Sequence, residues 1–235
     1  MKESVGHSQR RLLADVAHEL RSPLTALQGE IEVALRAERS VREYQFVLRS
    51  ALEEIECLTI MSDDLLLITR AESHQLPLDR VPTDPNAIVR CAVERVHRVI
   101  EEKGLAVRTA LDPAVTSVRF DPGLVARLVE HLLDNAVKFA PSGGWIVVRT
   151  EGMPAVNGVR VAVENSGPRI APADLPHLFE PFYRADQARS RGTGTGLGLA
   201  LVAAIARLHG GAVRASNQNG KGVRFEVDLP GGAVT

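Results

Sequence analysis

Two long amphipathic segments near the N-terminus place the strongest constraint on the fold of this chain. Residues 8–37 and 44–72 carry apolar residues at intervals of three or four, the period that gives an α-helix one apolar side. These apolar residues are Leu13, Val16, Leu20, Leu24, Leu27, Ile31 and Leu35, then Leu48, Leu52, Ile55, Leu58, Met61, Leu65 and Ile68. A short polar turn at Glu38 to Glu43 makes the two helices an antiparallel hairpin. A lone hairpin cannot bury both apolar sides, so we expect a second copy to complete a four-helix bundle.

The rest of the chain alternates helical patterns with strand-like runs. Asp84-Pro85 and Asp121-Pro122 each join a capping carboxylate to a first-turn proline, which predicts helices up to about Lys103 and Ala140. A further helix is expected at 196–209, because Gly210-Gly211 is a typical helix stop. Strands are expected at 76–81, 106–111, 115–120, 145–150, 159–164, 212–216 and 224–229.

This order of elements predicts an α+β protein. We expect a helical hairpin at residues 1–72 and a linker with an edge strand at 73–84. Residues 85–235 should form an α/β sandwich, in which the helices cover a mostly antiparallel sheet.

Composition excludes several classes of protein. The formal net charge of −1 argues against a nucleic-acid-binding protein, which normally has a basic face. The apolar runs are too short to span a membrane, so we expect no membrane contact by this chain itself. Cys57 and Cys91 are the only cysteines, which excludes a disulfide framework and fits a reducing cytoplasm. Each is expected to be a small buried apolar residue.

The sequence His18-Glu19-Leu20-Arg21-Ser22-Pro23-Leu24 places an imidazole beside a carboxylate, off the apolar side of the first helix. Such a carboxylate can fix the ring tautomer and leave the other ring nitrogen free to attack. Pro23 cannot donate to the carbonyl of Glu19, so we expect a bend one turn after the histidine. An isolated histidine of this kind is usually a solvated polar residue. This segment, however, resembles the phosphoacceptor box of sensor histidine kinases, and further motifs follow in that family's order.

Residues 130–139, EHLLDNAVKF, resemble the asparagine box of the family. Asn135 and Lys138 share a helix face with His131, because the three are spaced i, i+4 and i+7. An amide oxygen suits Mg²⁺ and an ammonium suits phosphate. The resemblance therefore assigns Asn135 to the metal and Lys138 to phosphate, whereas the alternative is a solvated polar face. His131 stands where many kinases have asparagine, and imidazole is a poor ligand for magnesium.

The segment Asn165-Ser166-Gly167-Pro168-Arg169 falls where the family has an Asp-x-Gly-x-Gly sequence at the adenine. The resemblance assigns Asn165 and Gly167 to adenine binding. Asn165 keeps an acceptor oxygen but lacks a charge, which predicts a weaker hydrogen bond. Glu164 is expected on the opposite face of its strand.

Two more segments resemble the ATP lid of the family. Residues 179–184, FEPFYR, resemble the aromatic box that precedes the lid, where Arg184 would reach the phosphates. The glycines after it allow close approach of the backbone, and a helix N-terminus attracts anions. A flexible linker is the alternative. By resemblance, the triphosphate cradle is formed by Gly192, Thr193, Gly194, Thr195, Gly196, Leu197 and Gly198.

Taken together, the resemblance implies the core of a homodimeric histidine kinase, with a GHKL or Bergerat-type ATP-binding domain that uses ATP and Mg²⁺. His18 would be phosphorylated while Glu19 orients the ring and takes its proton. The phosphoryl group would then pass to an aspartate in the receiver domain of a response regulator. Ser22, one turn after His18, implies phosphatase activity toward that regulator. Asn165 is similar to the variant found in the heavy-metal-sensing subgroup.

Family members are commonly attached to a membrane sensor, so the chain is also expected as the cytoplasmic part of an inner-membrane protein. One alternative is a non-catalytic dimeric scaffold, or a phosphatase-biased pseudokinase, whose degenerate pocket contains His131, Asn165 and Arg169. Another is an ATP-hydrolysing or serine-phosphorylating member of the same superfamily, which would leave His18 unexplained. The sequence does not reveal the signal, the regulator, or whether transfer occurs within or between subunits.

Overall fold

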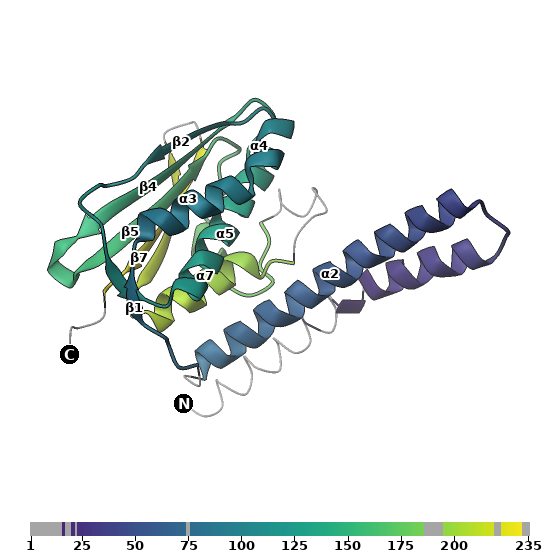
Figure 1. Cartoon of the computed structure of the whole chain (residues 1–235), viewed down its shortest axis with the longest axis horizontal. Coiled ribbons are helices and arrows are strands. Elements are labelled where there is room, and N and C mark those ends of the chain that lie inside the picture. Colours follow the sequence, from purple (N-terminus) through teal and green to yellow (C-terminus); the bar gives the residue numbers. More distant parts are fainter. Residues whose placement is uncertain are drawn as a thin grey trace. The chain divides into compact units, whose positions relative to one another are not determined.

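The computed structural model describes residues 16, 20–21, 23–73, 76–185, 195–218 and 222–231. The chain divides into two compact units, Met1–Leu66 and Leu67–Thr235. The first is a helical hairpin and the second is an α/β domain, each recognisable in Figure 1. The predicted α+β fold class is therefore confirmed. Among the described residues, no helix is both long and apolar enough to cross a membrane.

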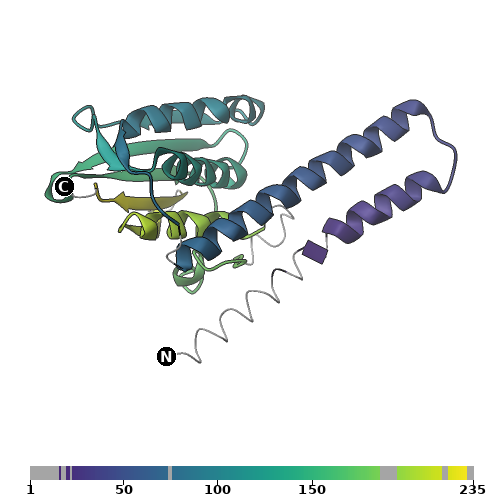
Figure 2. The same ribbon diagram turned by 60° about the horizontal axis from the view of Figure 1, so that its bottom comes forward.

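The hairpin pairs a helix that includes residues 23–35 with α2 (Val41–Glu72), and Figure 2 shows the two running antiparallel. Ser40 and Glu43 begin α2 with a capping box. The backbone N–H of Ser40 donates to Glu43 Oε2 at 2.8 Å, and the N–H of Glu43 donates to Ser40 Oγ at 3.3 Å. Helix α2 consequently begins three residues before the predicted residue 44. Ala34 and Ala51 are buried, which lets the two helices approach closely.

The α/β domain contains two sheets. Strands β1 and β3 form an antiparallel pair, and the larger sheet has the order β2-β4-β5-β7-β6. Only the β2–β4 pairing in the larger sheet is parallel, as a mostly antiparallel sheet requires. The elements are β1 (Val81–Thr83), α3 (Pro85–Arg95), α4 (His97–Glu102), β2 (Ala106–Ala110), β3 (Val118–Phe120), α5 (Pro122–Phe139), β4 (Trp145–Met153), β5 (Gly158–Asn165), α7 (Gly198–Leu208), β6 (Ala212–Gln218) and β7 (Gly222–Leu229), with 3-10 turns at Pro154–Val156 and Leu175–His177.

The two faces of the larger sheet differ in character. Helices α3, α5 and α7 lie side by side over one face (Figure 1), where fully buried residues such as Val148, Val161 and Val163 meet them. The other face carries ion pairs between neighbouring strands. Arg160 donates to Asp228 through Nε at 2.6 Å, and Arg224 Nη1 lies 3.5 Å from Glu164 Oε1. The pairing places each of these residues directly opposite its partner, so the alternation of buried and charged residues fixes the strand register.

Both predicted Asp-Pro helix starts are present. Asp84 accepts a hydrogen bond from the N–H of Asn86 at 2.8 Å, and Asp121 accepts one from the N–H of Leu124 at 3.1 Å. The first of these helices does not continue to Lys103 as predicted. It is broken at Val96, whose backbone angles (φ −91°, ψ 1°) leave the helical region between α3 and α4. No glycine or proline marks this break in the sequence.

Two predicted strands are shorter than expected. The strand expected at 76–81 is replaced by β1 (Val81–Thr83), which shares only Val81 with the predicted range. Before β1, the N–H of Asp79 donates to Asp121 Oδ2 at 3.2 Å and therefore does not pair with a strand. The strand expected at 115–120 is limited to β3, because Asn86 Nδ2 binds the carbonyl of Val115 at 3.1 Å and holds it in a turn.

The prediction for the cysteines was half wrong. Cys57 and Cys91 are free, as expected, but both are exposed. In α3 the buried side is formed by Val89 and Ala92, and Cys91 lies off that side. Cys57 is exposed on α2 although Met61, one turn further along, is buried. A position within an amphipathic helix therefore did not imply burial, because only one side of each helix is covered.

His209 joins the end of α7 to the start of α5. It is 1% exposed, its Nδ1–H donates to the carbonyl of Ile205 at 2.8 Å, and its Nε2 accepts from the N–H of Asp121 at 3.1 Å. Only a neutral imidazole can make both bonds. Burial lowers the pKa of His209, the Ile205 bond opposes this change, and nearby Arg80 adds to the lowering.

We predict that His209 makes stability depend on pH. Because the pKa is lower in the folded chain than the 6.5 of the free side chain, the unfolded state takes up the proton first. The contribution is therefore complete above pH 6.5 and is lost as the pH falls from 6.5 toward the folded pKa. Urea unfolding across this range should show a steeper loss of unfolding free energy for the wild type than for His209→Gln. Equal slopes would contradict the role of His209.

Candidate functional site

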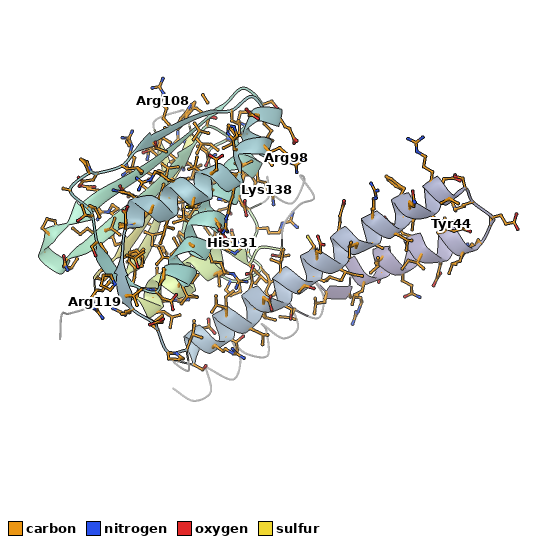
Figure 3. The ribbon with its side chains drawn as sticks, viewed as in Figure 1. Tyr44, Arg98, Arg108, Arg119, His131 and Lys138 are labelled. Carbon is orange, nitrogen blue, oxygen red and sulfur yellow. The ribbon has the colours of Figure 1, made fainter. Side chains whose placement is uncertain are left out.

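Helix α5 presents two different sides. Leu128, Leu132, Leu133 and Ala136 are fully buried, whereas the adjacent side carries His131, Asn135 and Lys138, which are all half-buried. Figure 3 shows His131 and Lys138 projecting from this helix. The structure therefore brings the three residues of the predicted asparagine box onto one side of a helix whose rotation is fixed by its apolar side.

Lys138 and Arg184 form a cluster of two cations. Burial is the main cause of a lowered pKa at Lys138, and the charge of Arg184 lowers that pKa further. The Lys138 Nζ also lies 5.2 Å from the ring centroid of Phe139. Two cations held close enough to repel each other favour an anion between them, and a phosphate group would relieve that repulsion. Arg184 is the last residue of the predicted aromatic box.

Asn165 ends β5 and is 2% exposed. Its Nδ2 donates to the carbonyl of Ser166 at 2.9 Å, which fixes the orientation of the amide and with it the direction of Oδ1. Gly167 lies against the end of α5, since a Cβ added there would be 3.0 Å from the carbonyl oxygen of Phe139. Asn165 and Gly167 thus lie beside the helix that carries Lys138. Glu164 faces the other side of the sheet, where it pairs with Arg149 at 3.1 Å.

The predicted aromatic box is bonded to the segment that begins α7. The N–H of Phe182 donates to the carbonyl of Gly196 at 3.0 Å. Both residues have positive φ, 62° at Phe182 and 72° at Gly196. A Cβ at Gly196 would come within 2.8 Å of the Phe182 backbone, so only glycine fits. Phe179 packs edge-on against Phe225 of β7, with ring centroids 6.5 Å apart, which anchors this segment to the sheet.

His131 packs against the first turn of α7. A Cβ added at Gly198 would lie 3.2 Å from His131 Nδ1, closer than nearly all such contacts. His131, which stands where many kinases have asparagine, therefore fills the space left by the absent side chain of Gly198. Leu197, by contrast, is fully buried, and its N–H lies 3.4 Å from Thr195 Oγ1, so these two residues fix the helix start from inside.

Sequence reasoning missed the residues that hold the surrounding loops. Asn217 of β6 donates to the carbonyl of Ile170 and accepts from its N–H, both at 2.8 Å. Tyr183 Oη donates to Asp174 Oδ1 at 2.7 Å. The strand predicted at 212–216 ended before Asn217, and nothing local in the sequence indicated its role, because its partner Ile170 lies 47 residues away.

Several predicted site residues lie outside the described part of the chain. These are the phosphoacceptor residues His18, Glu19 and Ser22, together with Gly192, Thr193 and Gly194 of the glycine-rich segment. Their assignments stay predictions from the sequence. Arg169, which replaces the second glycine of the adenine segment, is described and is exposed.

Comparison with protein families gave two matches along the chain. Residues 8–74 match the family described as His Kinase A (phospho-acceptor) domain. Residues 120–233 match the family described as histidine kinase-, DNA gyrase B-, and HSP90-like ATPase. The two matched segments cover most of the chain and occur in the order in which the sequence motifs were recognised.

The similar curated proteins are sensor kinases. Sensor histidine kinase CusS of Escherichia coli K12 is 37% identical over 97% of this chain and 47% of its own length. Probable sensor kinase SilS of Salmonella typhimurium is 33% identical over 97% of this chain and 46% of its own length. The chain therefore spans about half the length of the curated relatives it matches.

Solved structures with a similar fold include the histidine kinase AdeS and the protein ShkA. The Acinetobacter baumannii histidine kinase AdeS aligns with a TM-score of 0.75 and 27% identity, covering 92% of this chain and 98% of that chain. Full-length ShkA, solved in complex with AMPPNP, aligns with a TM-score of 0.72 and 25% identity, covering 95% of this chain and 46% of that chain.

We predict that Gly196 and Gly210 respond differently to alanine, although their φ angles are similar at 72° and 76°. Gly210→Ala meets open space and should cost only the left-handed backbone strain, about 1–2 kcal/mol of unfolding free energy. Gly196→Ala adds a clash with Phe182 and should cost about 1–3 kcal/mol more. Urea unfolding measures both costs, and hydrogen exchange at the Phe182 amide should accelerate only in Gly196→Ala. Equal effects of the two changes would contradict the tight contact.

Proposed function

Because the chain belongs to the sensor histidine kinases, we propose that it is a catalytic core that phosphorylates its own His18 from ATP and passes the phosphoryl group to a response regulator. The observation that carries this proposal is the polar side of α5. There Asn135 and Lys138 share one side of the helix, and Lys138 lies close enough to Arg184 for the two charges to repel. These residues fall in the segment that matches the ATPase family, while His18 falls in the segment that matches the phospho-acceptor family.

The nucleotide is expected on the polar side of α5. The repulsion between Lys138 and Arg184 supports a phosphate there, and the close approach of Gly196 to Phe182 brings the start of α7 to the same segment as Arg184. Asn165 would accept a hydrogen bond from the adenine amino group through Oδ1. The use of AMPPNP in the complex of full-length ShkA supports an adenine nucleotide as the ligand.

The donor set at α5 also fits Mg²⁺. The half-buried Asn135 offers an amide oxygen, which is a hard ligand of the kind that Mg²⁺ takes together with phosphates. Bound with the triphosphate, the ion would offset negative charge on the transferring group. Lys138 would hold the phosphates, and the neighbouring Arg184 would share that task.

The transfer step follows from the chemistry of the histidine. One ring nitrogen of His18 attacks the γ-phosphorus, a nitrogen–phosphorus bond forms, and the bond to the β–γ bridging oxygen breaks to release ADP. Glu19 orients the ring and takes up the proton that the ring loses. An aspartate of the receiver domain would then accept the phosphoryl group. We assign Ser22 to positioning the water that later removes it from the regulator.

A homodimer is supported by the apolar residues that the single hairpin leaves exposed. On the first helix, Leu24, Ile31 and Leu35 are 50%, 40% and 75% exposed, and their spacing of seven and four places them on one side. On α2 the spacing of seven, four and three unites Val41, Leu48, Leu52 and Ile55, which are 49–73% exposed. A second copy that covers these two stripes would remove them from water, because a monomer rarely exposes such a patch.

We predict that incubation with γ-labelled ATP and Mg²⁺ gives the wild-type chain an acid-labile, base-stable label. His18→Gln should take up no label, because glutamine cannot form the phosphorus–nitrogen bond of a phosphohistidine. His97→Gln is the matched control, since His97 is exposed on α4 and pairs there with Glu101 at 3.2 Å, and this variant should label normally.

An unlabelled wild type that still binds ATP would favour the scaffold alternative over the kinase. In the same preparations, Ser22→Ala should slow dephosphorylation of a phosphorylated regulator. A rate equal to that of the wild type would refute the role proposed for Ser22.

We predict that the chain sediments as a dimer at micromolar concentration and that the double variant Leu48→Glu, Leu52→Glu sediments as a monomer, because four charges would have to be buried in each bundle. Phe46→Glu is the control. Phe46 is 75% exposed but lies on the opposite side of α2, two residues before Leu48, so this variant should remain dimeric. A wild-type chain that sediments as a monomer would contradict the proposed four-helix bundle.

A further inference from the structure

Lys103 binds the C-terminal end of α5. Its Nζ donates to the carbonyl of Val137 at 2.6 Å, to that of Ala140 at 3.3 Å, and lies 3.4 Å from the carbonyl of Lys138. These are carbonyls that the end of a helix leaves without an intrahelical partner. Lys103 itself is the C-cap residue of α4, so one side chain ties the end of α4 to the end of α5.

The type of residue at this position is informative. The chain has 28 lysine and arginine residues, of which only four are lysine: Lys2, Lys103, Lys138 and Lys221. A compact ammonium has three donors on one nitrogen and can serve three converging carbonyls, whereas the flat guanidinium spreads its donors over a fork. The rare choice of lysine at position 103 therefore matches the geometry of the helix end.

The same helix end borders the proposed nucleotide site. Lys138 belongs to the last turn of α5, and the carbonyl of Phe139 is the atom that faces Gly167. A helix C-terminus carries partial negative charge, which disfavours an anion nearby. A phosphate held by Lys138 would be placed close to that charge. A cation on the terminal carbonyls offsets it.

We propose that Lys103 is a positioning residue for nucleotide binding. It fixes the last turn of α5, from which Lys138 projects, and neutralises the negative end of that helix so that Lys138 can hold phosphate. This role rests on the proposed binding of ATP by the chain. It predicts that Lys103 matters more for a charged nucleotide than for an uncharged nucleoside.

The test compares the affinity of the full chain for ATP and for adenosine by calorimetry. Lys103→Gln keeps hydrogen-bond donors at the helix end but removes the charge. This variant should weaken ATP binding about two- to fivefold, as expected for one charge at a helix terminus, and leave the affinity for adenosine nearly unchanged. Lys103→Met removes both the donors and the charge, so it should weaken ATP binding at least as much and also accelerate hydrogen exchange at the end of α5. Lys103→Arg keeps the charge, so it should retain the preference for ATP over adenosine, although its fork fits the three carbonyls less well.

The matched control is Arg98→Met, which removes a cation from the exposed surface of α4, where Arg98 pairs with Glu102 at 3.4 Å. This variant should bind ATP as the wild type does. An equal loss for ATP and adenosine in Lys103→Gln would show a purely structural role and overturn the proposal, as would no loss at all. If the wild type itself binds no ATP, the proposed function fails and this inference fails with it.

Discussion

The candidate site depends on the apolar side of α5. Four residues on that side, Leu128, Leu132, Leu133 and Ala136, have no exposure to solvent, so the helix cannot rotate without opening the core. This packing determines the direction in which the polar residues of the adjacent side, His131, Asn135 and Lys138, project. The chemistry of the site is therefore set by residues that never touch a ligand, and a cavity in this layer would disturb the site as well as the stability of the domain.

In the hairpin, too, each helix has an apolar side, but here that side is only partly buried. In the α/β domain, helices α3, α5 and α7 each pack their apolar side on the larger sheet, but two helices alone have only one seam between them. Small residues such as Ala34 and Ala51 fill that seam, and larger ones such as Leu48 are left in water. Incomplete burial is thus the physical link between the hairpin and its need for a partner.

Local chemistry explains what could be predicted from the sequence. Asp84 and Asp121 cap their helices through neighbours two or three residues away, and the asparagine box needs only helical spacing, so both were visible in the sequence. The turn at Val115 and the contacts of Asn217 depend on partners far along the chain, and no glycine or proline marks the break at Val96. Exposed cysteines were missed for a related reason, because periodicity shows which side of a helix is apolar but not how much of the helix is covered.

The outer face of the larger sheet limits where other molecules can attach. Asp228 bonds to both Arg160 and Arg214, and Arg224 to both Glu164 and Glu226, so opposite charges already neutralise one another across three strands. Covering this lattice would strip water from many ions and gain little attraction in return. This ion-paired face therefore disfavours the binding of other molecules, and we expect recognition to take place at other surfaces of the protein.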